Sequence, residues 1–404
     1  MQDIMEKVTK YTGLLKLSPA EVVTPMNIVK DMVDLLPAEI FRPESTFLDP
    51  AVKSGRFLLE LFNRLMESPA MIEAFPDTED RKKKILTEQL FGLATSETTA
   101  AIVRKALYDD PNETGNIRYT ADKFSKELIQ GAFHIMQFDV VIGNPPYNND
   151  IYIDFVTQGH NLAKQYDVWI TPAKWQAKGG KKNEDFRENI VPHMSKIVYY
   201  PYTNDVFDIT SQGGISYYII DRHKHNAIVN IKSSKHSFIK NECFTLEGRL
   251  TIYDSITEKI VRKVSTLNIS GKQLYLIDTG GKHKVKTTHL LCGTVNKINC
   301  FGGFIICPMT ITDNSLNIQN EFILFSSNNR DECFSFMSYI ESKLVRFLIL
   351  PSISSGSINN KETWRFVPDP GPFDHIFTDA ELYKKYNLTD EEINIIESVI
   401  KERK

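Results

Sequence analysis

The stretch FDVVIGNPPYNND, residues 138–150, decides the fold and raises the first chemical question. Its apolar run ends at Gly143, which is typical of a strand covered on both faces, as in a parallel sheet. Asn144, two prolines and Tyr147 follow at once. The prolines fix two φ angles and push Asn144 into an extended conformation. Either this is a rigid corner built for chemistry, or it is a proline-stiffened turn with a surface tyrosine.

Helical and strand patterns alternate on both sides of this stretch. Helical spacing of apolar residues marks 26–37, 56–68, 98–108 and 151–165, and strand patterns mark 45–55, 138–143, 166–172 and 215–221. Such alternation over about 220 residues predicts a doubly wound α/β sheet. Ligands of these sheets bind beyond the carboxyl ends of the strands, where the turns after FLD and VVIG lie.

The pattern of apolar and charged residues changes at about residue 222. Short strand-like pieces such as NAIVNIK and QLYLID alternate with basic loops, which predicts a second, smaller, mainly β (α+β) domain. Two capping boxes, Thr378 with Glu381 and Thr389 with Glu392, predict terminal helices. We therefore expect three parts, at residues 1–221, 222–375 and 376–404.

Composition describes an ordinary globular protein of 404 residues with 42% hydrophobic and 25% charged residues. No apolar run approaches the roughly 20 residues that a bilayer requires, so no membrane partner is expected. The start, MQDIMEKVTKYTG, has no apolar core of a secretory signal, which favours a cytoplasmic protein.

The five cysteines form no CxxC pair, which fits reduced thiols better than a disulfide framework. His289, Cys292, Cys300 and Cys307 are conceivable zinc ligands, but their spacing matches no common finger, and buried structural thiols are the alternative. No metal is expected to take part in the chemistry.

Residues 222–300 form a basic block in an acidic protein. They carry 14 lysines and arginines against 5 acidic residues, a net charge of +9, whereas the whole chain has a net charge of −3. The block is either a surface that faces phosphates or a solvated lysine-rich face.

The Asn-Pro-Pro-Tyr corner offers two hydrogen-bond acceptors close together, the side-chain oxygen of Asn144 and the backbone carbonyl of Pro145. Two acceptors on a rigid corner can grip one planar NH₂ group, such as N6 of adenine, while Tyr147 offers a flat face to the ring. Hydrogen bonds to both amino protons would draw the nitrogen out of conjugation and free its lone pair to attack an electrophile. Catalysis would then rest on positioning and hydrogen bonding, without a metal or a covalent nucleophile.

Nearly the whole chain resembles the N6-adenine DNA methyltransferases of bacterial restriction–modification systems and phages, which depend on S-adenosylmethionine. The similar motifs are SPAEVVTP (18–25), FLDPAVKSGRFLLE (47–60), FGLATSETTAAIVRKALY (91–108), FDVVIGNPPY (138–147), VWITPAKW (168–175), NDVFDI (204–209) and KETWRFVPD (361–369). Their order, with cofactor motifs first and the recognition domain last, is that of the gamma group. The resemblance implies a Rossmann-like class I methyltransferase sheet followed by a DNA target-recognition domain.

The resemblance also implies residues that bind the cofactor. Thr24 and Pro25 would lie beside its methionine end, with Glu21 close by. Asp49 would bind its amino group, and the turn from Ala51 through Lys53 to Gly55 would pass under it. Asp122 is the candidate for the acidic residue near the cofactor's adenine, and Asn144 also borders the cofactor.

The implied catalytic residues lie at the corner and in the NDVFDI motif. Asn144 and Pro145 would grip the target amine, Pro146 would stiffen the corner, and Tyr147 would stack on the target base. Phe207 would pack on the base from another side. An adenine inside a duplex cannot reach this corner, so it must be rotated out of the helix.

Two departures from the family pattern concern the cofactor pocket. Val52 and Lys53 replace a usual cysteine and glycine, so that Lys53 brings a side chain where backbone normally approaches the ligand. Lys53 would then reach the cofactor carboxylate instead. Ala94 stands where an acidic residue normally holds the ribose hydroxyls, and Glu97 is a candidate substitute.

Double-stranded DNA is therefore the expected partner. The resemblance also implies that a separate cognate restriction endonuclease can be a second partner. Two other functions remain open. Methylases of protein glutamine share the Asn-Pro-Pro-Tyr corner, but they are smaller and lack the basic block. A DNA-binding relative that no longer holds cofactor is the third hypothesis.

Overall fold

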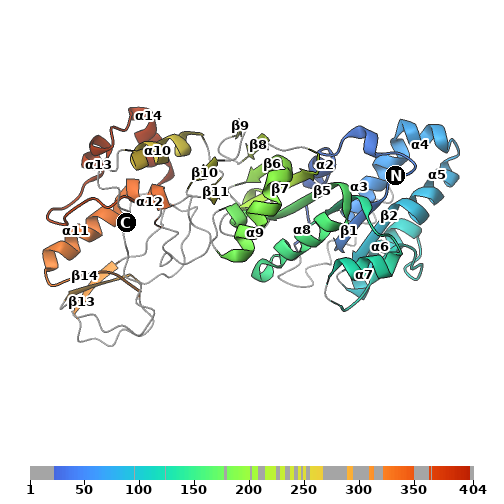
Figure 1. The fold of residues 1–404 in the computed structure, drawn as a ribbon, viewed down its shortest axis with the longest axis horizontal. Coiled ribbons are helices and arrows are strands. Elements are labelled where there is room, and N and C mark those ends of the chain that lie inside the picture. Colours follow the sequence, from blue (N-terminus) through green and yellow to red (C-terminus); the bar gives the residue numbers. More distant parts are fainter. Residues whose placement is uncertain are drawn as a thin grey trace. The chain divides into compact units, whose positions relative to one another are not determined.

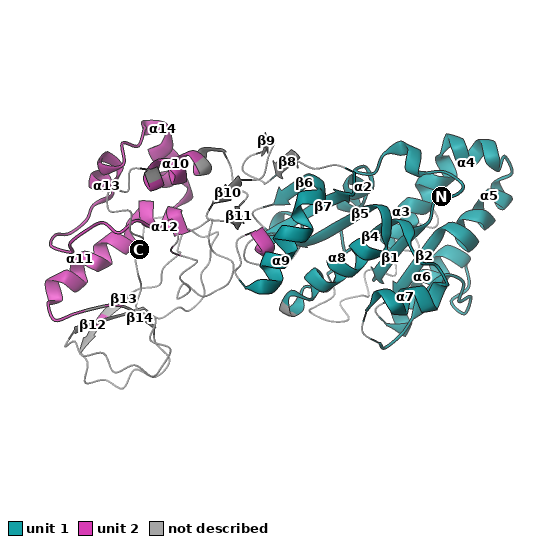
Figure 2. Cartoon of the chain, viewed as in Figure 1, with its two compact units in different colours: residues 1–173, 180–210, 214–243 teal, residues 174–179, 211–213, 244–404 magenta. Residues whose placement is uncertain are grey.

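The structure, a computed structural model, describes residues 22–94, 96–122, 124–176, 180–200, 203–207, 214–223, 228–232, 237–240, 244–246, 249–251, 255–266, 289–293, 309–313, 322–349, 364 and 366–400. The chain divides into two compact units (Figure 2). The first comprises residues 1–173, 180–210 and 214–243, and the second comprises 174–179, 211–213 and 244–404. The assignment of the second unit to target recognition stays a prediction.

The first unit is built on a nine-stranded sheet with the order β3-β2-β1-β4-β5-β7-β6-β8-β9 (Figure 1). Its strands are β1 (Phe47–Val52), β2 (Leu90–Ala94), β3 (Ile117–Tyr119), β4 (Phe138–Gly143), β5 (Ala163–Pro172), β6 (Met194–Tyr200), β7 (Ile215–Asp221), β8 (Ile228–Lys232) and β9 (Ser237–Lys240). β1 to β5 pair in parallel, whereas β7 runs antiparallel to both β5 and β6. The strand order reverses between β1 and β4, and this is the switch point at which α/β sheets bind ligands.

Helices connect the parallel strands. They are α2 (Met26–Val33), α3 (Arg56–Glu67), α4 (Pro69–Ala74), α5 (Thr78–Lys84), the π-helix η2 (Ile85–Gln89), α6 (Glu97–Tyr108), α7 (Lys126–Phe133), α8 (Ile151–Leu162) and α9 (Lys181–Asn189). The predicted doubly wound α/β sheet is confirmed. β1 and β4 are buried along their whole length, as the apolar run of residues 138–143 indicates. α2 ends at Val33, earlier than the predicted end at Pro37.

The described part of the second unit is α+β. It contains the hairpin of β10 (Phe244–Leu246) and β11 (Arg249–Thr251), the sheet of β12 (His289–Gly293), β13 (Met309–Asp313) and β14 (Phe322–Ser327), and the helices α10 (Ser255–Thr266), α11 (Arg330–Glu341), α12 (Lys343–Ile349), α13 (Asp379–Lys385) and α14 (Asp390–Val399). Helical side chains dominate its core, which includes Phe336, Tyr339 and Trp364.

One of the two predicted capping boxes is complete. The hydroxyl of Thr389 accepts from the amide of Glu392 (3.3 Å), and the Glu392 carboxylate accepts from the amide of Thr389 (2.8 Å). Thr378 likewise accepts from the amide of Glu381 (3.3 Å), but the Glu381 carboxylate pairs with His375 (2.9 Å) instead of returning to the cap. The neighbouring imidazole therefore competes for the side chain that would close the first box.

Among the described residues, no helix has both the length and the apolar character that crossing a bilayer requires.

Candidate active site

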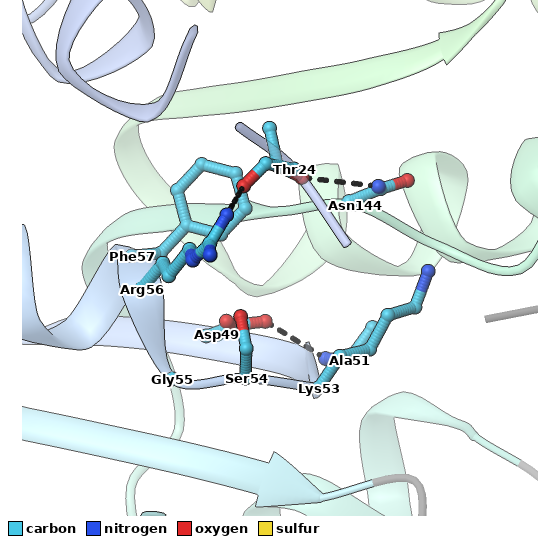
Figure 3. Close-up of a pocket in the computed structure, with 9 residues that line it drawn as sticks. All are labelled: Thr24, Asp49, Ala51, Lys53, Ser54, Gly55, Arg56, Phe57 and Asn144. Atoms are coloured by element: carbon cyan, nitrogen blue, oxygen red, sulfur yellow. Dashed lines mark hydrogen bonds between the residues drawn. The ribbon is translucent and has the colours of Figure 1, made fainter. Parts of the chain in front are cut away.

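The turns that follow β1 and β4 meet at the switch point of the sheet and enclose a small pocket. Side chains from both turns and from the segment before α2 line it (Figure 3): Thr24, Asp49, Ala51, Lys53, Ser54, Gly55, Arg56, Phe57 and Asn144. Residues predicted from the sequence for the cofactor and for catalysis thus meet in one place.

Asn144 is held by the segment that precedes α2. Its side-chain nitrogen donates to the carbonyl of Val22 (3.1 Å) and to the hydroxyl of Thr24 (3.1 Å), and only 3% of the residue is exposed. Its side-chain oxygen is buried and has no hydrogen-bond partner among the described residues. An unpaired buried acceptor is costly, so this oxygen is a place for a donor from outside the chain.

Tyr147 and Phe207 form an aromatic pair beside Asn144. Their ring centroids are 6.4 Å apart with an interplanar angle of 65°, and Phe207 is almost fully buried. The Tyr147 hydroxyl is buried, and burial raises its pKa, so it is a neutral phenol. Pro145 is buried and Pro146 is half-buried, as expected for a corner stiffened from within.

Asp49 lies in the middle of β1 and is buried. Its carboxylate accepts a hydrogen bond from the amide of Ala51 (3.0 Å). Burial raises the pKa of the Asp49 carboxyl to about 7, against the opposing effects of the Ala51 amide and of nearby Lys53. A carboxyl in this state gains strongly from a cationic ligand, because an adjacent positive charge favours its ionised form.

The turn after β1 turns back under the pocket. Val52 is buried and pairs with Ala94 at the ends of β1 and β2. Gly55 has a φ of 73°, and a Cβ there would lie 3.0 Å from the side chain of Val103 on α6. Glycine is thus required twice at this position, by the backbone conformation and by the close approach of α6.

Lys53 extends from this turn toward the catalytic corner. Its ammonium donates to the carbonyl of Val22 (3.4 Å) and lies 5.9 Å from the centroid of the Tyr147 ring. The lysine that departs from the family pattern therefore borders both the cofactor loop and the aromatic pair.

The predicted ribose and adenine contacts are less clearly placed. Ala94 is buried, and Glu97, the first residue of α6, pairs with Arg104 (2.9 Å). Asp122 is exposed and accepts a hydrogen bond from the Thr120 hydroxyl (3.0 Å). Neither acidic residue lines the pocket of Figure 3, so their roles stay predictions.

Pro25 stands directly before α2, whereas Glu21 lies outside the described residues. Ser54 lies within the predicted turn, whereas Arg56 and Phe57, which also line the pocket, were not predicted. Arg56 donates to the carbonyl of Thr24 (2.8 Å), and burial lowers its pKa. A cation at the first helical position, where the helix dipole disfavours positive charge, is the signal that could have identified it.

The candidate zinc ligands Cys300 and Cys307 and most of the basic block lie outside the described residues. Across the ranges that are described, no cluster of three or more His, Cys, Asp or Glu side chains could hold a metal ion. Two lysines of the block, Lys259 and Lys263, pair with Glu392 at 3.9 and 2.8 Å.

A doubly wound sheet with β7 inserted antiparallel between β5 and β6, and with its pocket between β1 and β4, defines a class I methyltransferase fold. A family model described as N-6 DNA Methylase matches residues 3–222, more than half of the chain. The chain belongs to this family, which confirms the predicted kind of enzyme, an adenine-specific DNA methyltransferase.

The individual proteins and solved structures that resemble this chain share less than 30% of its sequence. An "Uncharacterized adenine-specific methylase" of Mycoplasma pneumoniae is 26% identical over 371 aligned residues, which cover 67% of this chain and 82% of the relative. A modification subunit of a putative type I restriction enzyme from Vibrio vulnificus is 16% identical with a TM-score of 0.43, covering 57% of this chain and 51% of that chain. A type I restriction–modification methyltransferase subunit from Streptococcus thermophilus is 18% identical with a TM-score of 0.40, covering 61% and 53%. The matches thus span about half the length of these solved structures.

Proposed function

We propose that this protein transfers a methyl group from S-adenosylmethionine to N6 of an adenine in double-stranded DNA. The observation that carries the proposal is the buried side-chain oxygen of Asn144, whose amide nitrogen is already bound by Val22 and Thr24. An acceptor fixed in this way suits the exocyclic amine of a base, such as N6 of adenine, which presents two protons in the plane of a ring.

The residues of the corner prepare the amine for attack. The Asn144 oxygen and the Pro145 carbonyl accept the two amino protons, which concentrates electron density in the lone pair of the nitrogen. S-adenosylmethionine supplies an electrophilic methyl group on a sulfonium when it is bound. The target nitrogen would gain the methyl group as the methyl–sulfur bond breaks and its electron pair stays on sulfur, which becomes a neutral thioether. The nitrogen would then release one proton to solvent, so that the product is a neutral N6-methylamine. The rate gain comes from position and from hydrogen bonds that strengthen as charge develops.

The aromatic pair provides the place for the base. Tyr147 and Phe207 lie edge to face, so they present two differently oriented ring surfaces to a flat ligand. Rotating an adenine out of the duplex costs a few kcal/mol, and stacking on such rings offsets part of that cost.

The pocket residues fit the charges of the proposed cofactor. The buried Asp49 carboxyl suits its ammonium group, and Lys53 brings positive charge to the same pocket, where a carboxylate would lie. Thr24, Pro25 and the Ala51–Gly55 turn would border its methionine part, and we assign its ribose to the neighbourhood of Glu97.

Duplex binding and target recognition are proposed for the second unit together with the basic block. Lysines and arginines would hold phosphates, and polar side chains would read bases in the major groove. Neutralising several lysines between residues 272 and 297 is expected to weaken DNA binding and to flatten its salt dependence; an unchanged salt slope would mean that the block faces solvent. Whether the enzyme acts alone or beside a separate restriction endonuclease follows from its genetic setting.

Product analysis tests the proposal directly. Purified protein is incubated with S-adenosylmethionine and unmethylated duplex DNA, the DNA is digested to nucleosides, and the products are identified by mass spectrometry. We expect N6-methyl-2′-deoxyadenosine as the methylated nucleoside, together with enhanced fluorescence when 2-aminopurine replaces the target adenine. DNA binding without methylation and without cofactor binding would support the cofactor-deficient relative, for which the buried Ala94 at the end of β2 is the structural argument.

A further inference from the structure

The segment that precedes α2 is held by the turn after β1. The guanidinium of Arg56 donates to the carbonyl of Thr24 at 2.8 Å, and the ammonium of Lys53 donates to the carbonyl of Val22 at 3.4 Å. These bonds join stretches about thirty residues apart in the chain, and Figure 3 shows Arg56 reaching Thr24 across the pocket. Charge-assisted hydrogen bonds of this length are stronger than neutral ones.

The same segment fixes the side chain of Asn144. The Val22 carbonyl can only accept a hydrogen bond, so the end of the Asn144 amide that faces it must be the NH₂ group. A flipped amide would set two oxygens against each other at 3.1 Å, the present distance between the Asn144 nitrogen and the Val22 oxygen. The Thr24 hydroxyl binds the same nitrogen at 3.1 Å, so both amide protons are engaged and the oxygen is left for a ligand.

We propose that Arg56 is a positioning residue for methyl transfer. By holding the Thr24 carbonyl it keeps residues 22–24 against the Asn144 amide, and so keeps the Asn144 oxygen directed at the target amine. The inference rests on the proposed function, since the amine is the group that this oxygen would meet. Arg56 acts through Thr24 and has no direct part in the reaction.

The planar guanidinium suits this role. It offers five donors in a fixed geometry, so one face can hold the Thr24 carbonyl while other donors remain for neighbouring groups. Lysine at this position would supply the charge but not the planar set of donors. We therefore expect Arg56→Lys to restore only part of the methyltransferase activity.

A second role for Arg56 would be to bind the cofactor carboxylate, because the residue lines the same pocket. The two roles separate in experiment. A carboxylate contact adds to cofactor affinity, whereas a positioning contact adds to the rate of the chemical step.

The test compares Arg56→Gln and Arg56→Lys with wild type. Arg42→Gln is the matched control, because Arg42 lies on the surface and its ion pair with Glu44 is long, at 3.9 Å. Three quantities are measured: the Kd for S-adenosylhomocysteine by calorimetry, kcat for DNA methylation, and the hydrogen-exchange rate of the Asn144 side-chain amide in protein labelled with ¹⁵N-asparagine. The Asn144 signal is assigned from its loss in Asn144→Asp.

For Arg56→Gln we expect kcat to fall by about a hundredfold, as for small misplacements of catalytic groups. The Kd should change less than twofold, the Asn144 amide should exchange faster, and Arg56→Lys should lie between. A Kd that rises in step with the loss of activity, with unchanged exchange, would overturn the proposal in favour of a carboxylate contact.

Thr24→Val keeps the inference testable if Arg56→Gln fails to fold, because it removes the hydroxyl bond but keeps the shape of the side chain. We expect faster Asn144 exchange and lower kcat, and rescue of both by Thr24→Ser; unchanged exchange in Thr24→Val would contradict the proposal. The exchange measurement needs no turnover. A wild type that makes no methyladenine would therefore refute the proposed function alone, whereas unaltered exchange in the variants refutes the role of Arg56.

Discussion

The turns after β1 and β4 lie at the same edge of one sheet, yet they are organised in different ways. The corner at residues 144–147 is stiffened by two prolines, and the chain itself binds the Asn144 amide. The stretch from Asp49 to Gly55 contains a buried carboxyl with a raised pKa, a lysine and a glycine with left-handed backbone. The corner is thus complete in the protein alone, whereas the cofactor turn has charges that a zwitterionic ligand would neutralise.

This difference indicates how the two halves of the reaction are prepared. A preorganised acceptor pays no reorganisation cost when the target amine arrives. A buried carboxyl that is partly protonated at neutral pH must ionise to bind a cation, so binding of the proposed cofactor would be linked to pH.

The largest expected effect separates the two turns outright. Asn144→Ala should lower methyl transfer by at least about a thousandfold, comparable to losing a main transition-state hydrogen bond. The affinity for DNA should stay largely intact, and the affinity for S-adenosylhomocysteine should fall far less than turnover, because Asp49 and Lys53 would still hold the charges of that ligand. Steady-state kinetics and calorimetry check this. Near-normal turnover would remove the corner from the mechanism.

Tyr147 sharpens the description of the corner. Tyr147→Ala should weaken binding of the flipped base by about 1–3 kcal/mol, the range for stacking of a base on an aromatic side chain. Tyr147→Phe should retain most activity, since it keeps the ring that would stack on the base. Fluorescence of 2-aminopurine at the target position measures both variants. Equal losses in the two variants would assign the function to the hydroxyl and not to the ring.

Asp49 predicts how cofactor affinity depends on pH. Its carboxyl has a pKa of about 7 in the folded protein, against an ordinary value of 3.8. Because the pKa is raised in the folded protein, ionisation of Asp49 opposes folding. This group's contribution to the stability of the free protein therefore falls as the pH rises from 3.8 to about 7. Cofactor affinity should rise over the same window, by about tenfold per pH unit well below the folded pKa.

Calorimetry with S-adenosylhomocysteine between about pH 5.5 and pH 7 measures this slope. Asp49→Asn should bind more weakly, by roughly tenfold to a hundredfold for a lost hydrogen bond to a charged group, and with a flat profile. The same slope in the Asn variant would trace the pH dependence to another group.

Gly55 gives the smallest effect and concerns stability. Gly55→Ala should lower the free energy of unfolding by about 1–2 kcal/mol, because its φ of 73° is left-handed and its Cβ would approach Val103. Gly131→Ala on α7 is the control, since no atom lies within 4 Å of its Cβ position, and it should be neutral or stabilising. Denaturant unfolding compares the two; equal effects would show that the backbone at Gly55 is not strained.

The fold could be predicted because its strands and turns have strong local signals. The run FDVVIG forms β4 within its predicted limits, and Gly55 ends the cofactor turn as the resemblance implies. β6, by contrast, was not predicted, because MSKIVYY mixes polar and aromatic residues without a clear period.

The candidate site could be predicted only in its main residues. Asn144, Tyr147 and Asp49 stand in short motifs, so the resemblance identified them. The contacts of Arg56 with Thr24 and of Lys53 with Val22 join distant stretches of the chain, and no local pattern encodes them. The ion pair of Glu97 with Arg104, by contrast, is local, because both residues lie on α6 and are seven residues apart.

The most direct test of the central claim is long-read modification sequencing of DNA from a methylation-deficient host that expresses this chain, beside the same host expressing Asn144→Ala. We predict N6-methyladenine confined to one sequence motif with the wild type and absent with the variant. Methyladenine that persists with Asn144→Ala, or its absence from wild-type DNA although the protein is folded and expressed, would contradict the proposed catalytic corner.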